Sequence, residues 1–153
     1  MIDSGLNMRI YGNGWDVFEA DMKNSICYPG VAYEEIEELY LRSKIVLGQA
    51  SHFRNGMHDR IPTAMLAGAA VLTDYNDYLR MLFRDGLENG ELCMYDVSSP
   101  NKVSDIAYEM LEDVEKLYNL TLRAYEKAKT DFTWKSRAKE ITEVIRSVNK
   151  EKE

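Results

Sequence analysis

Three basic side chains stand close together near the middle of the chain, at Arg54, His58 and Arg60. Pro62 follows directly, and proline is tolerated in the first turn of a helix, so we expect Arg60 to lie at a helix start. A guanidinium group is a fixed cation whose forked N–H groups match phosphate oxygens, and a helix start adds unpaired N–H groups. These residues favour the binding of one small phosphate-bearing ligand.

Each of these side chains also has a simpler interpretation. Arg60 could pair with a surface carboxylate such as Asp59 or Glu34. His58 and His52 could contact phosphate or act as a base, but both could equally be solvated loop residues. We predict no metal site, because the histidines and Asp59 lack a tight ligand spacing.

Two further turns contain residues that suit a ligand site. Gly12 and Gly14 follow an expected strand at 7–11, and glycine allows the backbone to approach a ligand closely. Asp74 ends another expected strand. It is either a site carboxylate or the cap of an expected helix at 76–83.

Charge and hydropathy exclude several classes of function. The formal charge of −7 argues against an extended nucleic-acid surface, which needs clustered Lys and Arg. The longest apolar stretch, at 64–72, is far shorter than a membrane span of about 20 residues. The first residues lack the basic and apolar segments of a signal peptide, so we expect a cytoplasmic protein. Cys27 and Cys93 are expected to be free thiols.

Strands and helices are expected to alternate along the chain. Runs of apolar residues predict strands, and apolar residues at helical spacing predict helices. The expected strands lie at 7–11, 26–28, 44–48, 70–74 and 92–95, and the expected helices at 33–40, 62–67, 78–83, 103–117, 118–129 and 134–148. This alternation predicts an α/β fold with a mostly parallel sheet. The loops at 12–15, 50–60, 74–78 and 96–99 would then meet at the carboxyl edge, where such sheets bind ligands.

Taken in order, these segments resemble the C-terminal, donor-binding domain of GT-B fold, family 4-like glycosyltransferases of the spore maturation protein-related group. The similarity rests on IYGNGW at 10–15, GVAYEE at 30–35, SKIVL at 43–47, DRIPTAMLAG at 59–68, VLTD at 71–74 and FTW at 132–134 with Arg137. It covers nearly the whole chain.

The resemblance implies a Rossmann-like three-layer domain at 1–148 with C-terminal helices and a polar tail at 149–153. Such a domain holds the nucleotide diphosphate of an activated sugar as substrate, without a cofactor or metal. The implied donor site contains Gly12, Gly14, His58, Arg60, Thr63 and Asp74. An N-terminal domain binds the acceptor and supplies the general base, so we expect residues 1–153 alone to be inactive.

The chain departs from the family pattern at two places. Many relatives carry two glutamates at the positions of Asn55 and Thr63, and the second binds the donor ribose. Thr63 cannot hold both ribose hydroxyls as a carboxylate can. Related domains also begin with another strand and helix, and that strand lies in the middle of the sheet. Its absence suggests a fragment, a rearranged sheet, or a homodimer that exchanges elements.

Two other functions stay open on the sequence alone. The first is a non-catalytic nucleotide- or ligand-binding module of the same fold, which the missing glutamates favour. The second is an unrelated doubly wound domain such as a receiver, since fold does not determine function. A receiver should have an acidic cluster after its first strand, and Asp3 with the Gly12 turn does not provide one.

Overall fold

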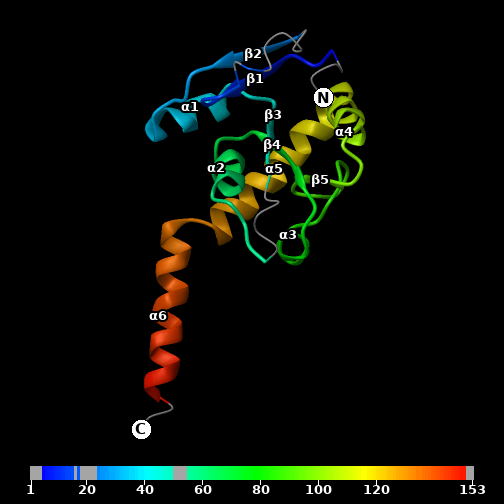
Figure 1. Cartoon of the computed structure of the whole chain (residues 1–153). Coiled ribbons are helices and arrows are strands. Elements are labelled where there is room, and N and C mark those ends of the chain that lie inside the picture. Colours follow the sequence, from blue (N-terminus) through cyan, green and yellow to red (C-terminus); the bar gives the residue numbers. More distant parts are fainter. Residues whose placement is uncertain (1–4, 16, 18–23, 50–54, 151–153) are drawn as a thin grey trace.

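The computed structural model of the chain describes residues 5–15, 17, 24–49 and 55–150. Figure 1 shows the order of its elements, in which helices and strands alternate as the sequence predicts. The strands are β1 (Met8–Tyr11), β2 (Ser25–Tyr28), β3 (Ile45–Leu47), β4 (Ala70–Asp74) and β5 (Cys93–Tyr95). The helices are the 3-10 turn η2 (Tyr33–Glu35), α1 (Ile36–Leu41), α2 (Arg60–Leu66), α3 (Asp77–Leu82), α4 (Lys102–Glu112), α5 (Val114–Asp131) and α6 (Trp134–Lys150).

A three-stranded parallel sheet with the order β3-β4-β5 lies at the centre of the fold. Ile45 of β3 pairs with Ala70 of β4, and Leu72 of β4 pairs with Cys93 of β5. All five residues of β4 are buried. A short run of apolar residues therefore gives a central strand, as expected for a parallel sheet covered on both faces.

Side chains of β4 alternate between two helix layers. Val71 packs in one apolar cluster with residues of α2, α3 and the second half of α5. Ala70 and Leu72 pack in another cluster with residues of α4 and the first half of α5. Because alternate residues of a strand point to opposite faces, each face of the sheet packs against its own set of helical residues, and α5 contributes to both. The Rossmann-like, three-layer α/β arrangement is confirmed.

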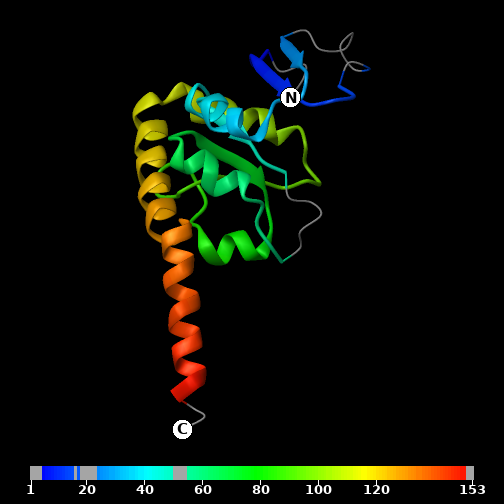
Figure 2. The ribbon, with the colours of Figure 1, turned by 90° about the vertical axis from the view of Figure 1, so that its left-hand side faces the viewer.

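The sequence predicts one sheet, but the described strands form two. Met8 of β1 pairs in parallel with Ser25 of β2, and these two strands bond only to one another among the described strands. Figure 2 shows this small sheet set apart from β3, β4 and β5. No described strand pairs with both sheets, so in the described part of the chain they are separate. The further strand expected from the family resemblance stays a prediction.

The prediction of one helix at 103–117 is wrong, because the helix is interrupted at Asp113. That residue is extended, with φ −107° and ψ 91°, and its carboxylate accepts a hydrogen bond from the N–H of Lys116 at 2.9 Å. It therefore ends α4 and caps the start of α5. The apolar spacing continues through Val114 and Leu117, and this hides the break in the sequence.

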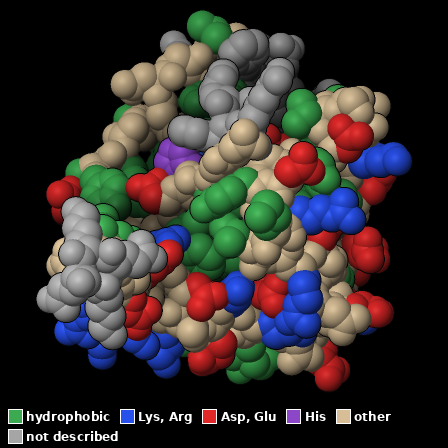
Figure 3. All heavy atoms as spheres, turned by 90° about the horizontal axis from the view of Figure 1, so that it is seen from below, with side chains coloured by type: hydrophobic (Ala, Val, Ile, Leu, Met, Phe, Trp, Pro, Cys, Tyr) green, Lys and Arg blue, Asp and Glu red, His purple; other side chains and the backbone are tan. Residues whose placement is uncertain are grey.

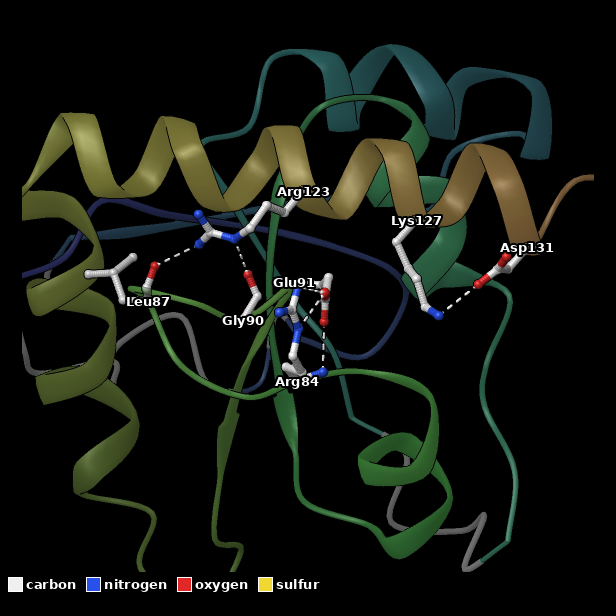
Figure 4. A network of polar contacts seen from close by, with 7 residues as sticks. All are labelled: Arg84, Leu87, Gly90, Glu91, Arg123, Lys127 and Asp131. Atoms are coloured by element: carbon white, nitrogen blue, oxygen red, sulfur yellow. Dashed lines mark hydrogen bonds and ion pairs between the residues drawn. The ribbon is translucent and has the colours of Figure 1, made fainter.

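Hydrogen bonds and an ion pair hold the loop between α3 and β5 in place. Glu91, whose side chain is 7% exposed, accepts hydrogen bonds from the backbone and the guanidinium group of Arg84. Arg123 reaches over from α5 and donates to the carbonyls of Leu87 (3.0 Å) and Gly90 (2.8 Å). Figure 4 shows these side chains converging on the loop. The contacts fix the entry into β5.

The last helix extends from the rest of the fold. α6 follows α5 after only Phe132 and Thr133, and it runs to Lys150, two residues into the segment expected to be a polar tail. Figures 1 and 2 both show it projecting away from the sheet and the other helices. The predicted apolar face is present, but it is exposed to solvent.

Candidate functional site

A small gap between side chains, which we call the hollow, lies where β3 and β4 end and α2 begins, and it is too small to admit a water molecule. Its lining residues come from these three places: Gly48, Gln49, His58, Arg60, Ile61 and Thr73. Figure 3 views the molecule from the end toward which β3 and β4 point, and shows apolar, basic and acidic side chains interspersed on this face. The sequence predicts a ligand site at this carboxyl edge, and the structure brings His58 and Arg60 together there.

Gly48 forms the back wall of the hollow because it lies directly against Thr73. A Cβ atom at position 48 would lie 2.8 Å from the Thr73 hydroxyl oxygen. The Gly48 N–H donates to the Leu72 carbonyl at 2.7 Å, and its carbonyl accepts from the Tyr95 hydroxyl at 3.2 Å. Burial, with a smaller effect of Asp74, raises the pKa of Tyr95, so this phenol stays a donor. The wall is closely packed.

His58 has two competing partners at the same ring nitrogen. Its Nδ1 atom accepts the backbone N–H of Arg60 at 3.2 Å, and it lies 2.5 Å from a carboxylate oxygen of Asp59. A nitrogen that carries a proton cannot accept the N–H, and a nitrogen without one cannot donate to the carboxylate. The Nδ1 atom can therefore serve only one of these partners: without a proton it accepts the N–H of Arg60, and with a proton it donates to Asp59.

Arg60 is the first residue of α2 and lies beside Tyr40 of α1. Burial raises the pKa of Tyr40, and the nearby Arg60 guanidinium partly offsets this increase. Among the described residues no carboxylate forms an ion pair with Arg60, so the alternative pairing with Asp59 or Glu34 is not seen. The neighbouring hydroxyl orients this cation without neutralising its charge.

Thr63 and Asn55 are not among the residues that line the hollow. The Thr63 hydroxyl donates to the Asp59 carbonyl at 2.8 Å, within its own helix. Its oxygen keeps lone pairs that can accept one further hydrogen bond. Asn55 is exposed.

Asp74 is 2% exposed, and its carboxylate accepts the hydroxyl of Thr73 at 3.2 Å. The alternative in which it caps the next helix is wrong. Asn76 is the N-cap of α3, and its side chain accepts the N–H of Leu79 at 2.8 Å. Asp74 lies behind Thr73 and is not a lining residue of the hollow.

Gly12 and Gly14 lie at the end of β1, in the small sheet. Both have positive φ, at 145° and 85°, as the predicted glycine turn requires. The turn lies against the Trp15 ring and close to Gly30. The structure does not bring these glycines to the hollow that Arg60 lines.

The sequence profile of one family, described as glycosyl transferase-like, matches residues 2–143, which is most of the chain. The chain belongs to the glycosyl transferase-like family. No curated protein matches it. Family membership supports a general role in glycosyl transfer, and it agrees with the α/β fold and its parallel strands. The GT-B class, family 4 and the spore maturation group stay predictions.

Two residues of the candidate site are missed by sequence reasoning. Gly48 ends an expected strand, and a glycine directly after a buried parallel strand could have indicated the close approach. Tyr40 stands among apolar residues at helical spacing, so the sequence predicts only a packing role for it. Its place beside Arg60 depends on how α1 lies against α2. His52 and Arg54 lie outside the described residues.

The remaining reactive groups show ordinary structural roles. Cys27 and Cys93 are free thiols, as predicted, and burial raises the pKa of Cys93 to about 12. Within the described ranges no cluster of three or more His, Cys, Asp or Glu side chains could hold a metal ion. No helix in the same ranges is long and apolar enough to cross a membrane.

Proposed function

We propose that the carboxyl edge of the sheet beside the hollow binds the diphosphate of a nucleotide sugar, and that this chain is the donor-binding domain of a GT-B type glycosyltransferase. The observation that carries the proposal is Arg60. Its guanidinium group lies at the start of α2 beside a neutral phenol, has no carboxylate partner among the described residues, and lines a hollow in a glycosyl transferase-like chain.

The chemistry of glycosyl transfer explains why such a cation is useful. The bond between the sugar carbon and the terminal phosphate oxygen breaks, and the nucleoside diphosphate leaves with the bonding electrons. Negative charge therefore develops on that oxygen in the transition state. A positioned guanidinium group therefore stabilises the transition state more than the intact donor, in which that oxygen carries less negative charge. The acceptor hydroxyl and the base that takes its proton would belong to a separate domain.

Calorimetric titration with UDP, GDP and ADP tests the proposal. We expect one of these nucleotides to bind and Arg60→Ala to weaken its binding about ten- to a hundredfold, because a charge-assisted contact to phosphate is lost. Arg42→Ala is the matched control, because Arg42 is an exposed arginine of the α1 end that already pairs with Glu38. Equal binding by the wild type and Arg60→Ala, or binding of none of the three nucleotides, would contradict the proposal.

A non-catalytic binding module is the second candidate. Asn55 and Thr63 stand where the resemblance places glutamates, and neither provides a carboxylate to hold the ribose. The two candidates differ when an acceptor-binding domain is added. A catalytic donor domain then transfers sugar from the nucleotide it binds, whereas a binding module leaves the nucleotide sugar intact. Residues 1–153 alone should show no transfer in either case.

A further inference from the structure

Three asparagines in the chain are followed directly by glycine, in the pairs Asn13-Gly14, Asn55-Gly56 and Asn89-Gly90. In such a pair the backbone nitrogen of the glycine can attack the asparagine side chain, because glycine has no side chain that shields the nitrogen or restricts the backbone. All three asparagines are exposed to water. The local structure around each pair therefore decides which of them can react.

The reaction, deamidation, needs only water. The glycine nitrogen loses its proton to hydroxide and bonds to the side-chain carbonyl carbon of asparagine. The bond from that carbon to the amide nitrogen breaks, ammonia leaves, and a succinimide ring remains. Water then opens the ring to aspartate or to isoaspartate, in which the backbone runs through the former side chain. A peptide that hydrogen bonds and packing hold in place must first open locally, so its reaction is slow.

The Asn89-Gly90 pair lies in a peptide that is held in place. The Gly90 N–H donates to the Gly86 carbonyl at 2.8 Å, and the Gly90 carbonyl accepts a hydrogen bond from Arg123 at 2.8 Å. A Cβ atom at position 90 would overlap the carbonyl oxygen atoms of Gly86 and Arg84. Figure 4 shows Gly90 bound to the Arg123 side chain of α5. The attacking nitrogen cannot move toward the Asn89 side chain unless this loop opens.

The Asn13-Gly14 pair has none of these restraints. Neither residue forms a hydrogen bond with any described residue, and both are exposed. Gly14 has a φ of 85°, and a Cβ atom there would have no neighbour within 4 Å. The ladder of the small sheet ends just before this pair, where the Gly12 N–H donates to the Tyr28 carbonyl at 3.1 Å. In the described part of the chain nothing holds the Gly14 nitrogen away from the Asn13 side chain.

The Asn55-Gly56 pair is intermediate between the other two. The Gly56 carbonyl accepts a hydrogen bond from the Asn76 side chain at 3.4 Å, and Gly56 is half-buried. One long hydrogen bond restrains this peptide less than the contacts of Gly90 do. It restrains the peptide more than the open surroundings of Gly14 do.

We propose that Asn13 is the first site of spontaneous deamidation in this chain, and that hydrogen bonds and packing protect Asn89. The reaction replaces an amide by a carboxylate, so the formal charge of −7 becomes more negative by one. The new charge lies at the carboxyl end of β1. An isoaspartate also lengthens the backbone beside the hydrogen bond between Gly12 and Tyr28, which loosens the end of the small sheet.

Incubation of the folded whole chain at mildly alkaline pH, followed by peptide mapping with mass spectrometry, tests the proposal. The peptide that contains Asn13 should be the first to gain about 1 Da. The Asn55 peptide should follow, and the Asn89 peptide should react at least about tenfold more slowly than the Asn13 peptide, because its loop must open first. If Asn55 or Asn89 reacts first, the proposal is wrong.

Two variants show whether the early mass gain belongs to Asn13. Asn13→Gln should remove it, because a glutamine side chain must close a larger ring and reacts more slowly. Asn89→Gln is the matched control and should leave the early gain unchanged. An early gain that persists in the Asn13→Gln chain would contradict the proposal.

Unfolding the chain in urea separates the effect of structure from that of sequence. All three pairs should then react at similar rates, because the contacts that distinguish them are lost. If Asn89 stays slow in urea, its neighbours in the sequence protect it, and the proposed role of the loop contacts is wrong. These measurements do not depend on nucleotide binding, so this site and the donor site can fail independently.

Discussion

Gly48, which lines the hollow, acts through its small size, and Tyr40, which lies beside Arg60, acts through its position. Gly48 allows β3 to end against Thr73, and Tyr40 orients Arg60 without neutralising its charge. Neither side chain would react with a sugar or a phosphate. Both determine where the reactive groups lie, and each can be tested without knowledge of the sugar or of the acceptor.

Gly48→Ala should reduce the free energy of unfolding by about 1–3 kcal/mol, because the new methyl group would overlap the Thr73 side chain. Urea unfolding followed by circular dichroism measures the loss. Gly30→Ala is a matched control, since a Cβ atom there would lie 3.9 Å from its nearest neighbour. We expect that control to stay within about 0.5 kcal/mol of the wild type. Equal losses in the two variants would show that the Gly48 contact is not the cause.

Thr63→Glu should strengthen nucleotide binding about five- to tenfold, because a carboxylate can accept both ribose hydroxyls where one threonine oxygen cannot. This prediction rests on the proposed donor site. Calorimetry with the nucleotide that the wild type binds measures the gain. A nucleotide analogue without ribose hydroxyls should bind the two proteins equally. Unchanged or weaker binding by the variant would place the ribose elsewhere.

At the scale of elements, the loop between α3 and β5 depends on a side chain from a distant helix. Arg123 donates to two loop carbonyls from α5, whereas Lys127, one turn later on the same helix, pairs only with the half-exposed Asp131 in Figure 4. Buried carbonyls that lose their donor are costly, and surface ion pairs contribute little. The two residues therefore give a matched comparison on one helix.

Arg123→Ala should lower the free energy of unfolding by about 1–3 kcal/mol. Lys127→Ala should lower it by about 0.5 kcal/mol or less. Guanidinium chloride unfolding of both variants provides the comparison. A loss of similar size in the two variants would mean that the loop is held by Glu91 and Arg84 alone.

Sequence patterns predict the elements better than the contacts between them. The apolar residues at 45–47 and 70–74 identify two strands of the core sheet, and Pro62 places Arg60 at a helix start. The break at Asp113 is missed because the apolar spacing of one helix continues across it, although the Asp113 cap starts a new helix. The Gly48 contact and the position of Tyr40 depend on how separate elements pack, which no local pattern encodes.

At the scale of the whole molecule, the two sheets should differ in stability. β4 is buried in the core, whereas β1 and β2 form a two-stranded sheet, which is marginal on its own. Amide hydrogen exchange followed by NMR should show β4 amides opening only with global unfolding. The amides of β1 and β2 should open through smaller, local fluctuations. Equal protection of both sheets would show that they unfold as one unit.

The projecting α6 also changes how a single copy of the chain moves in water. Its 17 residues span about 25 Å at 1.5 Å per residue, whereas a compact chain of this size has a radius of gyration of about 15 Å. The molecule is a compact body with a projecting helix, so its frictional drag in water depends on the direction of motion. Rotation about the axis of this helix is faster than end-over-end tumbling, and the N–H bonds of α6, which lie along that axis, sense mainly the slower rotation.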